Sequence, residues 1–275
     1  MTESRDDGGR DEFQAFVTGY VDNALQGLDE RWELAPLDLY DAVPYEVLGS
    51  LIARQASLAV ELARAPQVWT PNAAPLFLRA MTEVVITIRW IVGDFEARSK
   101  RFYLYGLGQH KLQMEHYKAR LADNPDDEKL KQFLESCSLW LEGQRREFFT
   151  DVDVGAWAGK SVREMARECD SEDLYKFAYT GFSSCVHSTW DHLGKHNAMY
   201  CSNPLHKQHR VPIVPDDAPD MDYLYRATKY LQLAYKAYDQ LFQLTPSTTM
   251  PLEWFASQME ASTEDAVRDA EDPTD

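Results

Sequence analysis

The residues best suited to chemistry lie close together in this sequence, in the stretch Leu174–Arg210. That stretch holds five of the seven histidines and two of the four cysteines. From His192 to Pro215 there is no acidic residue, although the whole chain carries 45 acidic and 28 basic residues. We therefore expect a polar, histidine-rich site in this region. Three kinds of chemistry fit its residues.

The first is hydrolysis by a serine nucleophile. Ser184, His187 and Asp191 are spaced i, i+3 and i+7, which places them on one face of a helix. Catalytic triads, however, draw their members from separate elements and need an oxyanion hole, and the sequence has no nucleophile elbow. The structural alternative, which we favour, is that the serine hydroxyls bond back to the helix and His187 finds a partner on a neighbouring helix. A carboxylate partner would raise the pKa of His187.

The second is metal binding. Cys201, His206 and His209 follow one another in a proline-containing loop, and His192 or His196 could complete a tetrahedral site for zinc. The spacing is not that of a standard zinc finger. A di-iron carboxylate site is not expected, because the chain has no Glu-x-x-His motif. Zinc is therefore the one cofactor that the sequence suggests, and otherwise none is expected.

The third is recognition of a phosphate-bearing ligand such as RNA. Two basic segments lack acidic residues, 97–114 and 192–215. In so acidic a protein these segments could face one another across a cleft, or they could be two unrelated solvated faces. The candidate ligand-binding residues are Arg101, Tyr179, Ser183, Ser184, Lys207 and Arg210.

A charged pair interrupts an otherwise apolar segment earlier in the chain. Arg79 and Glu83 are four residues apart, so on a helix they share a face and can pair. A charge on so apolar a helix needs a partner or water. The pair is either a structural contact inside a bundle or part of a polar pocket. In the second case Arg79, Glu83 and His187 are the candidate catalytic residues.

Helices must position these residues, because apolar residues recur at helical spacing and strand-like alternation is missing. Ser161 and Glu164 fit a capping box, and a tyrosine stripe within 221–244 is expected to be core. The expected helices are 11–28, 44–65, 71–93, 95–122, 126–150, 161–169, 171 to at least 193, 221–244 and a short one near 251–261.

From these helices we predict an all-α fold, a single bundle of seven or eight helices over 11–245. A disordered tail (1–10) precedes the bundle, and an acidic, partly disordered tail (246–275) follows it.

Composition excludes some partners. The net charge of −17 argues against a protein that coats double-stranded DNA or an anionic membrane, since phosphates attract basic surfaces. The most apolar run, 76–92, contains three charged residues, so no membrane span is expected. Cysteines without CxxC spacing and an N-terminus without an apolar signal core favour a cytoplasmic protein with reduced thiols.

Short motifs in the chain resemble a bacterial, all-helical family of unknown function, the domain family numbered fifty-six seventy-seven. The motifs are Arg79-x-x-x-Glu83, Tyr179-x-x-x-Ser183 and Val186-His187-Ser188. The resemblance covers about residues 45–238. It implies a helical fold and a polar site at Arg79, Glu83 and His187, and it implies no specific activity.

A looser similarity is to HEPN-type helical domains, which are metal-independent ribonucleases and serve as toxins or phage-defence effectors. Their motif pairs an Arg with a His a few residues later. This chain departs from the motif, because no Arg precedes His187 at that spacing and Arg101 lies too far before His110.

Two functions are compatible with these residues. The first is a binding or regulatory helical module, which could form a homodimer, with a pocket at His187. The second is an enzyme that cleaves RNA or a nucleotide phosphodiester. In that enzyme His187 would act as general acid or base, and Arg79, Arg101 or Arg210 would stabilise the developing charge. The sequence leaves open whether the protein is an enzyme.

Overall fold

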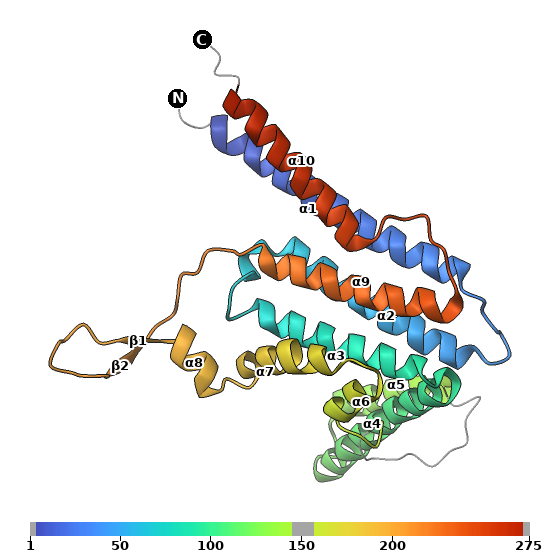
Figure 1. Cartoon of the computed structure of the whole chain (residues 1–275). Helices are drawn as coiled ribbons and strands as arrows, with labels where there is room; N and C mark the ends of the chain where they lie inside the picture. Colours follow the sequence, from blue (N-terminus) through green and yellow to red (C-terminus); the bar gives the residue numbers. More distant parts are fainter. Residues whose placement is uncertain (1–3, 145–156, 272–275) are drawn as a thin grey trace.

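A computed structural model describes residues 4–144 and 157–271 of the chain. The described residues are mainly helical, as expected, and they include one small antiparallel hairpin (Figure 1). The elements in chain order are α1 (Ser4–Leu34), α2 (Ala42–Arg64), the 3₁₀ turn η1 (Pro66–Val68), α3 (Ala74–Val92), α4 (Phe95–Asp123), α5 (Glu128–Gln144), α6 (Val162–Glu168), the π-helical segment η3 (Leu174–Tyr179), α7 (Thr180–Val186), α8 (Trp190–His196), β1 (Ala198–Tyr200), β2 (Arg210–Pro212), α9 (Asp222–Phe242) and α10 (Pro251–Glu271).

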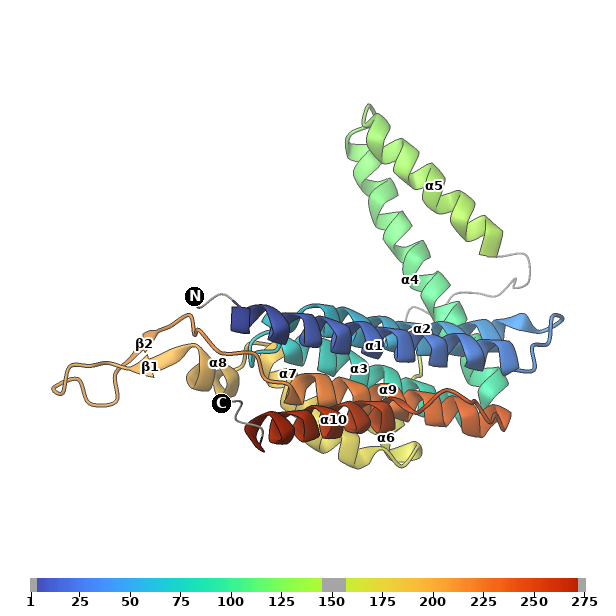
Figure 2. The same ribbon diagram turned by 90° about the horizontal axis from the view of Figure 1, so that it is seen from above.

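The core lies between α2, α3 and α9, which run side by side through the middle of the molecule (Figures 1 and 2). The all-round apolar character of α3 explains its central place, and Leu78, Ile86 and Ile88 are fully buried. The tyrosine stripe on α9 is core, as expected. Tyr238 is fully buried there, and the Tyr235 hydroxyl donates a 2.6 Å hydrogen bond to the Ala24 carbonyl.

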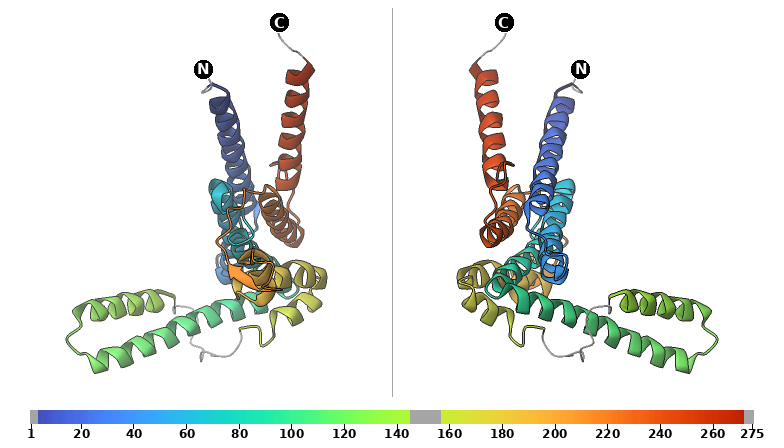
Figure 3. Two further views of the ribbon diagram at one scale, coloured as in Figure 1. Left: turned by 90° about the vertical axis from the view of Figure 1, so that its left-hand side faces the viewer. Right: turned by 90° about the vertical axis from the view of Figure 1, so that its right-hand side faces the viewer.

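Two long helices, α1 and α10, cover one side of this core and diverge toward their far ends (Figure 3). A buried ion pair, with 2.9 Å between Arg31 Nε and Asp239 Oδ1, fixes α1 to α9. The sequence suggests a tail over residues 1–10, whereas helix α1 already begins at Ser4. The helix expected near 251–261 is longer in the structure and ends at Glu271.

A helical arm formed by α4 and α5 projects from the bundle (Figure 2). The Asn124-Pro125 break turns the chain between the two helices, because proline disfavours helix at the preceding residue. Their contact has a small apolar core of its own, consisting of Leu107, Met114, Leu134 and Leu141. The expected helix 126–150 is observed as Glu128–Gln144, and residues 145–150 lie outside the described part.

The count of seven or eight helices is wrong, because the described residues form ten α-helices. The main reason is the expected continuous helix 171–193, which is divided into η3, α7 and α8. Ser188 adopts a left-handed φ of 49°, and Thr189 is extended at the start of α8. Consecutive Ser and Thr residues favour such a break, because their hydroxyls compete for backbone hydrogen bonds.

The absence of strands is also a wrong prediction. Strands β1 and β2 pair antiparallel with Tyr200 opposite Arg210 and Ala198 opposite Pro212. Each strand has only three residues, which is too short to give a recognisable alternation in the sequence. None of the described helices has the length and apolar character needed to cross a membrane.

Candidate functional site

Arg79 is the centre of a polar cluster between α3 and the η3–α7 segment. Its Nε donates a 2.8 Å hydrogen bond to Ser183 Oγ, and its Nη1 lies 2.6 Å from Glu83 Oε2. The Ser183 hydroxyl in turn donates to the Tyr179 carbonyl at 2.7 Å. The structure thus brings together four of the predicted site residues, from two segments far apart in the sequence.

The guanidinium of Arg79 also stacks on the Tyr179 ring, with 3.3 Å from Cζ to the ring centroid. Burial raises the pKa of the Tyr179 hydroxyl, and the Glu83 charge raises it further. The Arg79 side chain is only 14% exposed. Its charge is paired with Glu83, and its planar face packs on the Tyr179 ring. This cluster therefore joins α3 to α7, and it matches the structural reading of the Arg79–Glu83 pair.

His187 does not join this cluster. It caps the C-terminal end of α7 and is exposed, and its ring makes no hydrogen bond, ion pair or ring contact among the described residues. The expectation that it would contact a neighbouring helix is wrong, because the chain leaves the helical path at this residue. Ser184 donates instead to the Gly181 carbonyl, and Asp191 pairs with Lys195 at 2.6 Å. No Ser-His-Asp arrangement forms from these residues.

The buried histidine of the region is His192, on α8. Its Nε2 lies 2.9 Å from the side-chain oxygen of Asn72, and its ring lies next to that of His196, with 4.8 Å between centroids. Burial lowers the pKa of His192, and the nearby His196 lowers it further. The sequence suggests His187 for a polar pocket, whereas the histidine that lies beside a cavity in the structure is His192.

A cavity of about 480 Å³ adjoins this histidine, between α7, α8 and the start of α9. Charges of both signs line it. Asp191 pairs with Lys195 there, and Asp222 pairs with Arg226 at 2.6 Å. Its size suits a small molecule. Because its cations already have carboxylate partners, the cavity does not select for an anion.

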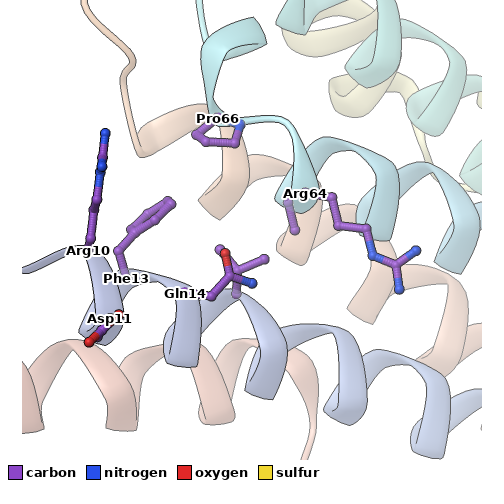
Figure 4. A pocket seen from close by; sticks show the side chains of 8 residues that line it. Arg10, Asp11, Phe13, Gln14, Arg64 and Pro66 are labelled. Carbon is purple, nitrogen blue, oxygen red and sulfur yellow. The ribbon is translucent and has the colours of Figure 1, made fainter. Parts of the chain in front are cut away.

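A second hollow, of about 490 Å³, lies between the N-terminal part of α1 and the end of α2. Figure 4 shows Phe13 pointing toward Pro66, while Arg64 extends away from the hollow. The residues that line it include none that the sequence singles out for chemistry. It therefore adds no candidate site.

The hairpin brings together three residues that the sequence predicts as metal ligands. Each of Cys201, His206 and His209 offers a ligand atom within 4.8 Å of the other two. Cys201 is partly exposed, and the two histidines are exposed. His192, expected as a possible fourth ligand, is not part of this group, because Asn72 holds it in the pocket on α8.

Arg210 lies between two exposed aromatic rings beside the hairpin. Its Cζ is 5.0 Å from the Tyr200 ring centroid and 5.7 Å from that of Trp190. Its Nη1 donates a 2.9 Å hydrogen bond to the carbonyl of Gly194, where an added Cβ would come within 2.8 Å of the guanidinium. Glycine at this position therefore permits the close approach.

The other basic segment, 97–114, lies far from the hairpin (Figure 1). Arg101 lies on α4 and donates to the Ala158 carbonyl at 3.4 Å, whereas the hairpin lies at the opposite end of the molecule (Figures 1 and 2). The two basic segments therefore do not face one another across a cleft, which was one of the two alternatives left open by the sequence. Sequence reasoning also missed Trp190 and Tyr200. The available signal was that aromatic and basic residues are interleaved from Trp190 to Arg210, where Asp191 is the one acidic residue.

Comparison with known proteins gives one match. The model of a family described as "Family of unknown function (DUF5677)" matches residues 45–203, which is more than half of the chain. No curated protein and no solved structure matches the chain. The matched region contains the Arg79 cluster and Cys201, and it ends before His206 and His209. The chain is therefore a member of the family of unknown function DUF5677.

Proposed function

We propose that this protein is a binding module for single-stranded RNA, and that α8 with the β1–β2 hairpin forms the binding surface. We name this the hairpin surface, and its residues are Trp190, Tyr200, Lys207 and Arg210. The carrying observation is the position of Arg210 against Tyr200 and Trp190, whose side chains are 63% and 67% exposed. Exposed aromatic rings next to an arginine are a stacking platform for unpaired bases.

Charge supports a phosphate-bearing ligand. Residues 192–215 carry three basic residues and no acidic residue, within a chain of net charge −17. Arg210 has no carboxylate partner among the described residues, and its contacts are with a backbone carbonyl, a tyrosine hydroxyl and aromatic rings. Lys207 is exposed and makes no ion pair in the described part of the chain. An RNA phosphate would supply the missing anion.

The same features favour a single strand over a duplex. Base stacking on Trp190 and Tyr200 is possible only where bases are unpaired. A duplex would need a broad basic surface, which the overall charge disfavours. We assign no cleavage step to the surface, because His187, the expected general acid or base, contacts neither Arg79 nor Arg210 among the described residues.

Fluorescence anisotropy with a short labelled oligouridine, recorded over a series of salt concentrations, tests this proposal. We expect binding that weakens as salt increases, and competition by unlabelled RNA single strands but not by duplex DNA. Substitution Lys207→Glu should weaken binding strongly. The matched control is Lys129→Glu on α5, which changes the same charge at an exposed lysine outside the hairpin surface.

A second pair of variants tests the contribution of aromatic stacking to RNA binding. Trp190→Ala should weaken binding by about tenfold, since one base–aromatic stack contributes about 1–3 kcal/mol. Phe177→Ala removes another exposed ring, 80% exposed on η3, and should leave binding unchanged. Equal affinities for Lys207→Glu and Lys129→Glu, or no binding even at low salt, would refute the proposal.

A further inference from the structure

We infer that Cys201, His206 and His209 bind one zinc ion at the tip of the hairpin. The hairpin geometry explains why the three meet. Tyr200 pairs with Arg210, so Cys201 and His209 are the next residues on the two sides, and the Cys201 N–H donates to the His209 carbonyl at 2.9 Å. Two turns in the loop then bring His206 back: its N–H donates to the Asn203 carbonyl, and the His209 N–H donates to the His206 carbonyl.

The separation of the ligand atoms is close to that of a zinc site. Zinc–sulfur and zinc–nitrogen bonds of about 2.3 and 2.0–2.1 Å at a tetrahedral angle place the two ligand atoms roughly 3.6 Å apart. Cys201 Sγ lies 3.7 Å from His206 Nδ1. All three ligand atoms lie within 4.8 Å of one another, so small rotations of the exposed histidine side chains are enough to complete the site.

Neighbouring groups already orient two of the ligands. The backbone N–H of Asn203 points at Cys201 Sγ, with 3.5 Å from nitrogen to sulfur, and this contact fixes the position of the sulfur. The side-chain nitrogen of Asn203 lies 3.2 Å from His206 Nε2, which leaves Nδ1 facing the sulfur. Contacts of this kind set the orientation of ligands and increase metal affinity.

The donor set selects the metal. One thiolate and two imidazoles are the ligands that zinc prefers, and no carboxylate belongs to the group, which disfavours magnesium and calcium. Three ligands from the chain leave one position for water. The thiolate and Zn²⁺ together add one positive charge to the hairpin, which already lacks acidic residues.

Zinc would also stabilise the hairpin. Its two strands have three residues each, and an isolated two-stranded hairpin is at best marginally stable in water. A metal that connects Cys201 to His206 and His209 closes the loop next to Tyr200 and Arg210. The zinc site stands on its own geometry and does not depend on the proposed RNA binding.

Metal content of the full chain, purified without a histidine tag and kept reduced, tests the inference. We expect one zinc per chain by mass spectrometry. Replacement by Co²⁺ should give the thiolate-to-cobalt charge-transfer band and the strong visible bands of a tetrahedral site. Cys201→Ser should abolish the charge-transfer band, and His206→Ala and His209→Ala should each weaken zinc binding at least about 100-fold.

The controls use the same residue types outside the group. Cys137→Ser on α5 and His116→Ala on α4 should keep the stoichiometry, the spectrum and the affinity. A chain that binds no zinc at micromolar concentrations, or a Cys201→Ser variant with an unchanged cobalt spectrum, would overturn the inference. Because these measurements contain no RNA, they distinguish failure of the zinc site from failure of the proposed function.

Discussion

Arg79 donates a 2.8 Å hydrogen bond from its Nε to the Oγ of Ser183, a residue 104 positions later in the chain. This bond connects the two polar motifs of the family-matched region, one on α3 and one on η3–α7. Glu83 and Tyr179 complete the cluster on either side of the guanidinium. Because the Nε, the Nη1 and the planar face of Arg79 each have a protein partner, we interpret the cluster as a structural connection between the two segments.

The first prediction concerns this connection. Arg79→Ala should lower the free energy of unfolding by about 2–3 kcal/mol, because it removes a charge-assisted hydrogen bond to Ser183 and the stack on Tyr179. Arg79→Lys should recover only part of the loss, since a lysine cannot stack and pair at the same time. Urea unfolding of each variant measures both effects.

Another arginine provides the comparison. Arg226 forms an i, i+4 ion pair with Asp222 and is 47% exposed, against 14% for Arg79. Arg226→Ala should therefore change stability by no more than about 0.5 kcal/mol. Similar losses for the Arg79 and Arg226 variants would show that burial of the Arg79 cluster contributes little.

The second prediction separates two histidines of the same region. His187→Ala should leave the melting temperature unchanged, because the ring is exposed and has no partner in the described part of the chain. His192→Ala should lower the free energy of unfolding by about 1–3 kcal/mol, since it removes a buried ring and leaves the half-buried Asn72 side chain without its hydrogen-bond partner. Thermal unfolding of the two variants decides this, and a destabilised His187→Ala variant would contradict the structure.

Much of the fold could be predicted from the sequence, because local pattern decides it. Apolar periodicity gives α3 and α4 to within a few residues, and Ser161 with Glu164 forms the capping box that its spacing indicates. The break between α7 and α8 at Ser188–Thr189 could not be predicted from local pattern in this way. Helix and turn have similar local free energies in a Ser/Thr-rich run, and packing against α3 decides between them.

The candidate site divides in the same way. Cys201, His206 and His209 are close in sequence, and a single loop brings them together, so their spacing was informative. His192 is as close in sequence to Cys201 as the other candidate ligands would require. Its position is instead fixed by a hydrogen bond with Asn72, which comes 120 residues earlier. Likewise, nothing in the local sequence indicates that Arg101 lies on the projecting arm while Arg210 lies beside α8. Long-range packing decides those positions.

The third prediction is a pH dependence that arises from His192. Burial and the neighbouring His196 and Lys195 lower the pKa of His192, while Asp191 opposes the shift. A lowered pKa means that the folded state resists protonation, so the stabilisation is complete above the unfolded pKa of about 6.5 and is lost as the pH falls below it. The free energy of unfolding should therefore decrease from pH 7.5 to pH 5.

His192→Gln tests this directly, because glutamine can still donate to Asn72 but does not titrate. The variant should lose less stability than the wild type over the same pH interval. His116→Gln, at an exposed position on α4, should follow the wild-type curve. Parallel curves for the wild type and His192→Gln would rule out His192 as the source of the pH dependence.

The last prediction concerns Glu30, which joins α1 to the linker between α9 and α10. Its carboxylate accepts hydrogen bonds from the backbone N–H groups and hydroxyls of Ser247 and Thr248. These bonds lower the pKa of Glu30 from 4.5 to about 2. The stabilisation is therefore complete above about pH 4.5 and is lost as the pH falls toward 2.

Glu30→Gln should destabilise the protein at pH 7, since a neutral amide cannot accept four hydrogen bonds as strongly as a carboxylate does. The difference from the wild type should shrink as the pH decreases below 4.5, because the wild-type carboxyl then becomes neutral too. Urea unfolding between pH 7 and pH 3 gives this difference.

The control is Glu33→Gln on the same helix, at an exposed glutamate with no hydrogen-bond partner in the described residues. This variant should have the same stability as the wild type over the same pH range. A constant difference for Glu30→Gln across the range would mean that the hydrogen bonds do not depend on the charge of Glu30, and that the linker is held by packing alone.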